Sequence, residues 1–178
     1  MSFGRIARIA FLVSGAVFLT AFITSGGGHP TTAAQPRSES GERHCTHVGG
    51  SIITNFGAVD ANTTLGPVTG DLRGAVAAML LTAPQPGPNG TVIFHVQHHW
   101  VTESGDNIYL DPAVATTVPV QNSQTRFAII TYPSRITGGT GRFAGATGDV
   151  NYFGEADLVA GTALRYSGQI CFADPDDR

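Results

Sequence analysis

The chain has 178 residues, of which 10 are basic and 13 are acidic, for a formal net charge of −3. All ten basic residues are arginines, and the lack of lysine excludes Schiff-base catalysis and the lysine of a phosphate-binding P-loop. No basic cluster follows the N-terminal segment, so nucleic acid is not an expected partner.

The N-terminal segment has the layout of a signal peptide. Arg5 and Arg8 precede a run of 15 uncharged, mostly apolar residues, 9–23. A membrane-spanning helix needs about 20 apolar residues, which makes an uncleaved anchor the weaker alternative. We therefore predict a signal peptide over 1–34, a secreted or periplasmic protein, and no stable membrane insertion once the signal is removed.

The rest of the chain is expected to hold one domain. Residues 35–43 are polar and lack an apolar period, which predicts a flexible linker. Residues 44–174 suit a single domain, and 175–178 form a short tail. Cys45 and Cys171 lie near the two ends of this domain, and in an exported protein such a pair favours a disulfide over a reactive thiol or a metal site. The disulfide would make the first and last strands neighbours.

The domain sequence is typical of an all-β fold. It has no sustained helical period, and turn residues recur regularly along it. One segment, 68–82, contains several Ala and Leu residues that favour helix locally, and we still assign it to a strand. The expected strands are 47–56, 68–82, 91–103, 108–116, 125–137, 146–158 and 162–172. Seven or eight strands with joined ends predict a closed antiparallel β-barrel of about eight strands.

The most distinctive motif is Gly138-Gly-Thr-Gly-Arg-Phe143, within residues 136–148. Its glycines permit unusual backbone angles, and Phe143 is placed to plug a barrel end. The motif resembles the Gly-Gly-Thr-Gly-x-Phe segment of dirigent proteins and the related segment of allene oxide cyclases, including bacterial members with that barrel. The resemblance implies an eight-stranded barrel with an apolar cavity. It does not carry over a catalytic side chain, because Ala144 and Thr147 occupy the positions where those families place a glutamate and an arginine.

Residues 91–103 form the strand richest in chemistry. Alternation places Phe94, His98 and Trp100 on the interior face, where the imidazole of His98 could act as an acid or a base. On the other face, His95 and His99 are about 13 Å apart, too far to bind one metal ion together. The strand therefore predicts no metal site.

Later strands supply further candidates for the same cavity. The phenol of Tyr166 could orient a carbonyl or an enol, although a tyrosine packed at a barrel seam would look the same in the sequence. We predict His98 and Tyr166 as catalytic residues, and Phe94, Trp100, Tyr132 and Phe143 as substrate contacts. Standard nucleophile and nucleotide-binding motifs are absent from the sequence, so no cofactor is expected.

Two functions fit these features. The first is a cyclase or isomerase acting on a small apolar molecule, which requires a cavity of about 300 Å³ or more. The second is a non-catalytic, lipocalin-like barrel that binds a ligand or serves as a structural module. The sequence does not separate them, and it also leaves open whether the chain forms a homo-oligomer.

Overall fold

The computed structural model describes residues 44–121 and 123–172, which form strands and two short 3-10 turns. The strands are β1 (His44–Asp60), β2 (Thr63–Gly70), β3 (Gly74–Leu80), β4 (Gln85–Pro86), β5 (Val92–Thr102), β6 (Asn107–Leu110), β7 (Ala113–Pro119), β8 (Arg126–Thr131), β9 (Pro133–Gly139), β10 (Thr147–Asp157) and β11 (Gly161–Phe172). The 3-10 turns are η1 (Pro88–Gly90) and η2 (Gly141–Phe143). The predicted signal peptide, linker and C-terminal tail lie outside the described residues.

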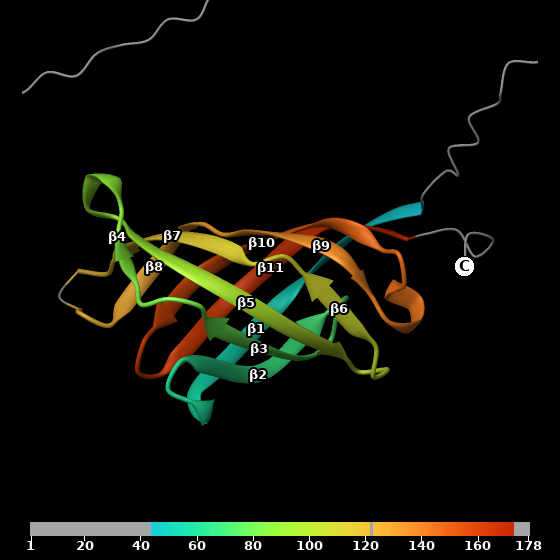
Figure 1. The fold of residues 1–178 in the computed structure, drawn as a ribbon, viewed down its shortest axis with the longest axis horizontal. Coiled ribbons are helices and arrows are strands. Elements are labelled where there is room, and N and C mark those ends of the chain that lie inside the picture. The colour runs from blue at the N-terminus through green and yellow to red at the C-terminus, as the bar shows by residue number, and fades with distance from the viewer. Residues whose placement is uncertain (1–43, 122, 173–178) are drawn as a thin grey trace, which may run out of the picture. The chain divides into compact units, whose positions relative to one another are not determined.

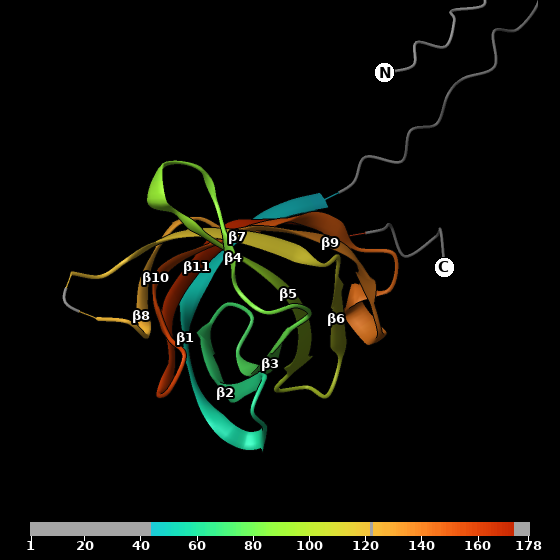
Figure 2. The same cartoon turned by 60° about the vertical axis from the view of Figure 1, so that its left-hand side comes forward.

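The strands form one closed antiparallel sheet (Figures 1 and 2). When the two parts of each bent strand are taken together, each strand pairs with the next one along the chain, and β11 pairs back with β1. β6 and β7 are two parts of one bent strand, as are β8 and β9, while β4 is a short addition that pairs with β5. Counted in this way the barrel has eight strands, which confirms the predicted fold class. Within the described residues, no helix is long and apolar enough to cross a membrane.

The seam between β1 and β11 closes the barrel. Its pairing runs without a break from His44 opposite Phe172 to Asn55 opposite Gly161. Cys45 lies directly opposite Cys171 in this register, and the two form a disulfide. The predicted disulfide between the two ends of the domain is therefore confirmed.

One predicted strand, 68–82, is wrong in its bounds. It is two strands, β2 and β3, joined by a turn at 71–73. Gly70 has a φ of 93°, a conformation that glycine adopts without strain and that lets the chain reverse there. β2 also begins earlier than expected, at Thr63. The prediction missed this start because Gly66 and Pro67 interrupt the strand pattern in the sequence.

The predicted strands 108–116 and 125–137 are each broken in the middle. The first breaks just before Pro112 and the second just before Pro133, since proline cannot donate a hydrogen bond to a strand ladder. The breaks face each other, because β6 pairs with β9 while β7 pairs with β8. They bend the barrel wall at one level, close to Tyr132.

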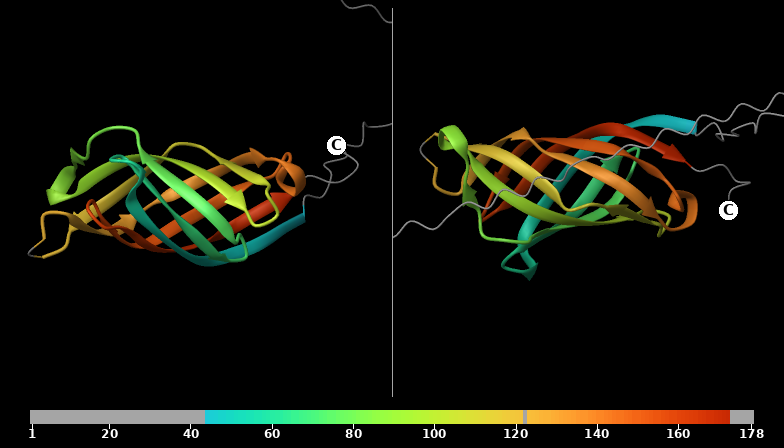
Figure 3. Two further views of the ribbon diagram at one scale, coloured as in Figure 1. Left: turned by 90° about the horizontal axis from the view of Figure 1, so that it is seen from below. Right: turned by 45° about the horizontal axis from the view of Figure 1, so that its top comes forward.

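Different turns and strand ends lie at the two ends of the barrel (Figure 3). The disulfide end carries the start of β1, the end of β11, the turns β2–β3 and β5–β6, and η2. The cavity end carries the turns β1–β2 and β10–β11 and the loop after β3. Large buried side chains, including Trp100 and Phe143, fill the disulfide half. The other half retains an internal cavity.

Replacing both Cys45 and Cys171 by serine should lower the free energy of unfolding by about 4 kcal/mol, because the bond closes a loop between residues 126 positions apart. Denaturant unfolding of the double variant against wild type measures this loss. A reducing agent should destabilise wild type to a similar extent and leave the double serine variant unchanged. A loss below about 1 kcal/mol would show that strand pairing alone holds the seam.

Candidate functional site

The barrel interior contains an apolar cavity of about 60 Å³. It occupies the cavity end, where alternate residues of each strand point inward. Its wall consists of Ile52, Thr54, Phe56, Thr64, Val76, Ala78, Leu80, Phe94, Val96, His98, Ala115, Ile129, Tyr132, Tyr152, Ala156, Leu158, Thr162 and Leu164. Most of these side chains are aliphatic or aromatic, so the cavity offers a ligand mainly hydrophobic contact.

The cavity brings together half of the predicted site residues. Phe94, His98 and Tyr132 line it. Trp100 and Tyr166 are buried in the packed half of the barrel instead, and Phe143 lies in η2 at the disulfide end. The structure therefore offers no cavity contact for these three residues.

A cluster of three rings forms the polar part of the cavity wall. The hydroxyl of Tyr132 and Nε2 of His98 are 2.8 Å apart and share a hydrogen bond. The ring of Tyr152 stacks on His98 with 5.0 Å between centroids, and it lies 4.7 Å from the ring of Tyr132. β5 supplies His98, β10 supplies Tyr152, and the bend between β8 and β9 supplies Tyr132. The cluster thus depends on the proline break at Pro133.

Burial keeps all three rings uncharged at neutral pH. Burial, with a smaller contribution from the nearby His99, lowers the pKa of His98 to about 4. Burial also raises the pKa of both tyrosines. The neutral imidazole of His98 is therefore the form present near pH 7.

Two polar atoms of this cluster are enclosed without a partner. Nδ1 of His98 and the hydroxyl of Tyr152 are fully buried and have no hydrogen-bond partner among the described residues, and the same holds for the hydroxyl of Ser134. These atoms lie behind the cavity surface, so a molecule in the cavity touches ring faces rather than these atoms. Acid–base chemistry at His98 would first require the rings to move.

The cavity threonines are also internally paired. The hydroxyls of Thr54 and Thr162 are 2.7 Å apart and hydrogen-bond each other across the β1–β11 seam. The hydroxyl of Thr64 lies 3.5 Å from the carbonyl oxygen of Ala78. These contacts use the hydroxyl groups within the wall and leave the cavity surface apolar.

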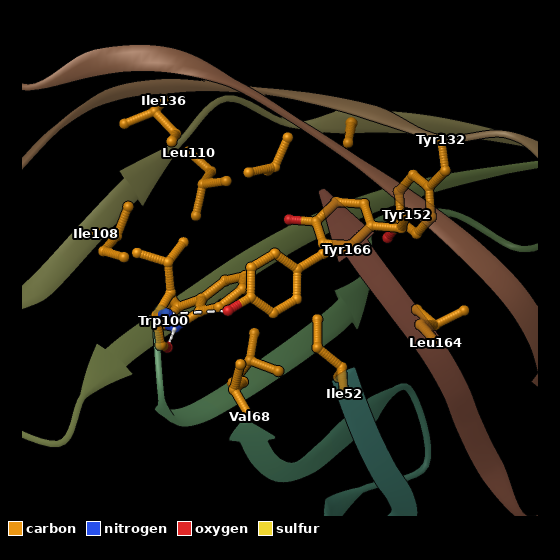
Figure 4. Packing of buried hydrophobic residues seen from close by; sticks show 14 of the residues in the cluster. Ile52, Val68, Trp100, Ile108, Leu110, Tyr132, Ile136, Tyr152, Leu164 and Tyr166 are labelled. Atoms are coloured by element: carbon orange, nitrogen blue, oxygen red, sulfur yellow. Dashed lines mark hydrogen bonds between the residues drawn. The ribbon is translucent and has the colours of Figure 1, made fainter. Parts of the chain in front are cut away.

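Tyr166 and Trp100 tie a turn to the barrel interior (Figure 4). The hydroxyl of Tyr166 accepts a hydrogen bond from the backbone N–H of Leu72 and donates one to the carbonyl of Thr69. The indole N–H of Trp100 donates to the carbonyl of Leu72, and the two rings pack edge to face. Tyr166 therefore holds the β2–β3 turn, and its catalytic role stays a prediction.

The glycine-rich motif closes the disulfide end. Phe143 is fully buried and packs near Phe172. A side chain at Gly139 would collide with the backbone of Asn107, and Gly141 adopts a φ of 52° beside Asp106. The motif acts here as a plug, on the other side of the packed half from the cavity.

The exterior histidines do not assemble a metal site. His95 and His99 point to the outer face of β5, as the alternation predicts. Within residues 44–121 and 123–172, no group of three His, Cys, Asp or Glu side chains is placed to hold a metal ion.

Sequence reasoning missed Tyr152, which completes the ring cluster. Val150, Tyr152 and Ala156 share the inward face of β10, so alternation alone could have identified an interior aromatic residue. Its contact with His98 could not be predicted in this way, because it depends on the register among β5, β9 and β10.

No family model matches this sequence, and no curated protein matches it. Among solved structures, the chain is similar to a pterocarpan synthase dirigent protein, with 15% sequence identity and a TM-score of 0.34. The match covers 81% of this chain and 100% of that protein. A likeness this distant says nothing about what this chain binds or converts, and the finer resemblance to allene oxide cyclases stays a prediction.

The stability of the protein should fall by up to about 3 kcal/mol as the pH falls from 6.5 to 4, through His98 alone. The unfolded chain binds a proton at this residue in that range and the folded chain does not, so acid favours unfolding. Denaturant unfolding at several pH values should show a shallower dependence for His98→Gln than for wild type. His99→Gln, which changes the exposed neighbour, should keep most of the wild-type slope. Equal slopes for wild type and His98→Gln would contradict the assignment.

Removing the hydroxyl of Tyr166 should destabilise the fold by about 1–3 kcal/mol, because the buried N–H of Leu72 loses its partner. Unfolding of Tyr166→Phe against wild type measures this. Tyr109→Phe is the matched control, since Tyr109 is half exposed on β6 and its loss of a hydroxyl should change stability by less than about 0.5 kcal/mol. Equal effects of the two substitutions would argue against the structural role of Tyr166.

Proposed function

We propose that this barrel binds a small apolar molecule, or the apolar end of a larger one, in its interior cavity. The observation that carries the proposal is unfilled space lined by aliphatic and aromatic side chains, in a barrel whose other half holds large buried side chains. Dry apolar cavities of about 150 Å³ bind benzene or xenon without a hydrogen bond, and this smaller cavity suits an atom such as xenon or the end of an apolar chain. The ligand would be held by shape and hydrophobic contact.

The size of the cavity favours binding over catalysis. Its volume of about 60 Å³ falls well short of the roughly 300 Å³ that the cyclase hypothesis requires. The enclosed Nδ1 of His98 and hydroxyl of Tyr152 point the same way, because neither reaches the cavity surface. We therefore favour the non-catalytic, ligand-binding alternative.

The polar cluster has a clear role in such a binding protein. The hydrogen bond between His98 and Tyr132 joins β5 to the bend between β8 and β9, and these two segments do not pair with each other. It keeps the rings in place as one wall of the cavity. Their uncharged state preserves the hydrophobic character of that wall at neutral pH.

Xenon is a suitable probe, and Ala78→Leu should weaken its binding by at least about tenfold, because the larger side chain fills the cavity. Ala75→Leu makes the same change at an exposed position of β3 and should leave binding unchanged. Xenon NMR titration measures both. Absence of xenon binding to wild type, or equal binding by both variants, would refute the proposal.

A further inference from the structure

Three exposed apolar side chains stand at the cavity end of the barrel. They are Val59, Leu81 and Val159, with 60%, 45% and 73% of their surface exposed. Val59 lies near the end of β1, Leu81 follows β3, and Val159 lies in the turn between β10 and β11. We call these three residues the apolar rim.

The segments that carry the rim lie side by side. The backbone N–H of Phe56 donates to the carbonyl of Ala160 over 3.4 Å, which joins the end of β1 to the β10–β11 turn. The N–H of Leu80 donates to the carbonyl of Asn62 over 2.9 Å, which joins the β1–β2 turn to the end of β3. The three rim residues therefore sit on consecutive, connected segments around one end of the barrel.

The rim continues the apolar surface of the cavity. Phe56, Leu80 and Leu158 line the cavity and are half-buried, and each lies within three residues of a rim residue. Hydrophobic surface thus extends from the interior to the outside at this end.

Charge is sparse around the rim. Segments 57–62, 80–91 and 158–161 contain one charged residue, Asp60, and Asp157 precedes the last of them. Asp60 accepts hydrogen bonds from the backbone of Asn62 and the hydroxyl of Thr63, so its carboxylate is turned toward its own loop.

The other charges near this end are engaged in a similar way. Asp157 accepts from the backbone N–H groups of Val159 and Ala160. Arg126 forms an ion pair with Glu155. The disulfide end differs, because its turns carry several charged residues: Asp71, Arg73, Glu103, Asp106 and Arg142. The segments that carry the rim are therefore poorer in charge than the turns at the opposite end.

We propose that the apolar rim docks on an uncharged lipid surface, such as a phosphatidylcholine bilayer. Exposed Val and Leu side chains gain free energy on leaving water for the lipid interface. Anionic lipid would add nothing, since the arginine nearest the rim is already paired with a carboxylate. In this orientation the cavity faces the lipid, where apolar molecules concentrate.

A protein partner fits the rim less well. A stable protein interface uses about 20–30 residues from each side, whereas the rim offers three apolar side chains. Two of the exposed apolar residues on the barrel wall stand near charged residues and do not enlarge it. Phe153 lies opposite Arg165 in the β10–β11 pairing. Ile130 lies on β8, the strand that carries Arg126 of the ion pair with Glu155.

The test places an environment-sensitive fluorophore on the full chain, either at Ala160→Cys beside the rim or at Ser104→Cys at the disulfide end. With phosphatidylcholine vesicles, emission from position 160 should shift to the blue, and emission from position 104 should not. Added phosphatidylserine or salt should leave the shift unchanged. The label reports the rim itself, so lipid contact by another part of the chain does not produce the signal.

Rim variants then test which side chains are responsible. Replacing Val59, Leu81 and Val159 together by serine should weaken the apparent lipid affinity at position 160 by at least about tenfold. The matched triple variant at Val101, Ile130 and Phe153, which are exposed on the barrel wall, should retain it.

Several results would overturn the proposal. They are no shift at position 160, equal shifts at both positions, unchanged affinity in the rim variant, or a requirement for anionic lipid. Lipid-free self-association that the rim variant abolishes would instead assign the surface to a second copy of the chain. Xenon binding in lipid-free solution is measured separately, so failure of lipid docking leaves the proposed cavity function standing.

Discussion

The pairing of β1 with β11 is the constraint on which the rest of this molecule depends. A sheet of this length with free edges would expose a row of unpaired backbone groups on both sides. The seam pairs them from His44 to Asn55 on one strand with Phe172 to Gly161 on the other. The disulfide between Cys45 and Cys171 sits at the start of this pairing. Closure converts one face of every strand into a shared interior, and only then can residues distant in sequence form a cavity wall.

The interior is divided between packing and space. In the disulfide half, the rings of Trp100 and Tyr166 meet and their polar atoms are used by the β2–β3 turn, so this half is both filled and hydrogen-bonded. In the cavity half, the inward positions include small residues such as Ala78, Ala115 and Ala156, which leave the space unfilled. The rings of His98, Tyr132 and Tyr152 stand among the cavity wall residues. A barrel built for stability alone would be filled throughout, which is why we attach function to the unfilled half.

Local patterns predicted the fold and part of the site. Alternation along β5 correctly placed Phe94, His98 and Trp100 inside, because period-2 alternation survives in a strand with one buried face. The cysteine positions predicted the seam for a similar reason, since two residues at the ends of a domain can bond only if those ends meet. The sequence could not show how deep each inward residue lies along the barrel axis. Trp100 and His98 share a face, yet one is packed against Tyr166 and the other lines the cavity.

The glycine-rich motif shows why the resemblance to known families predicts the fold better than it predicts the chemistry. Its distinctive residues are needed where Gly139 approaches Asn107, where Gly141 approaches Asp106, and where Phe143 fills the disulfide end. These requirements follow from closing a barrel, whatever the barrel holds. The cavity wall is drawn from other strands, and its residue types are common to many apolar interiors. A motif that recurs for a structural reason therefore identifies the scaffold, and our proposal of a ligand rests instead on the residues at the opposite end.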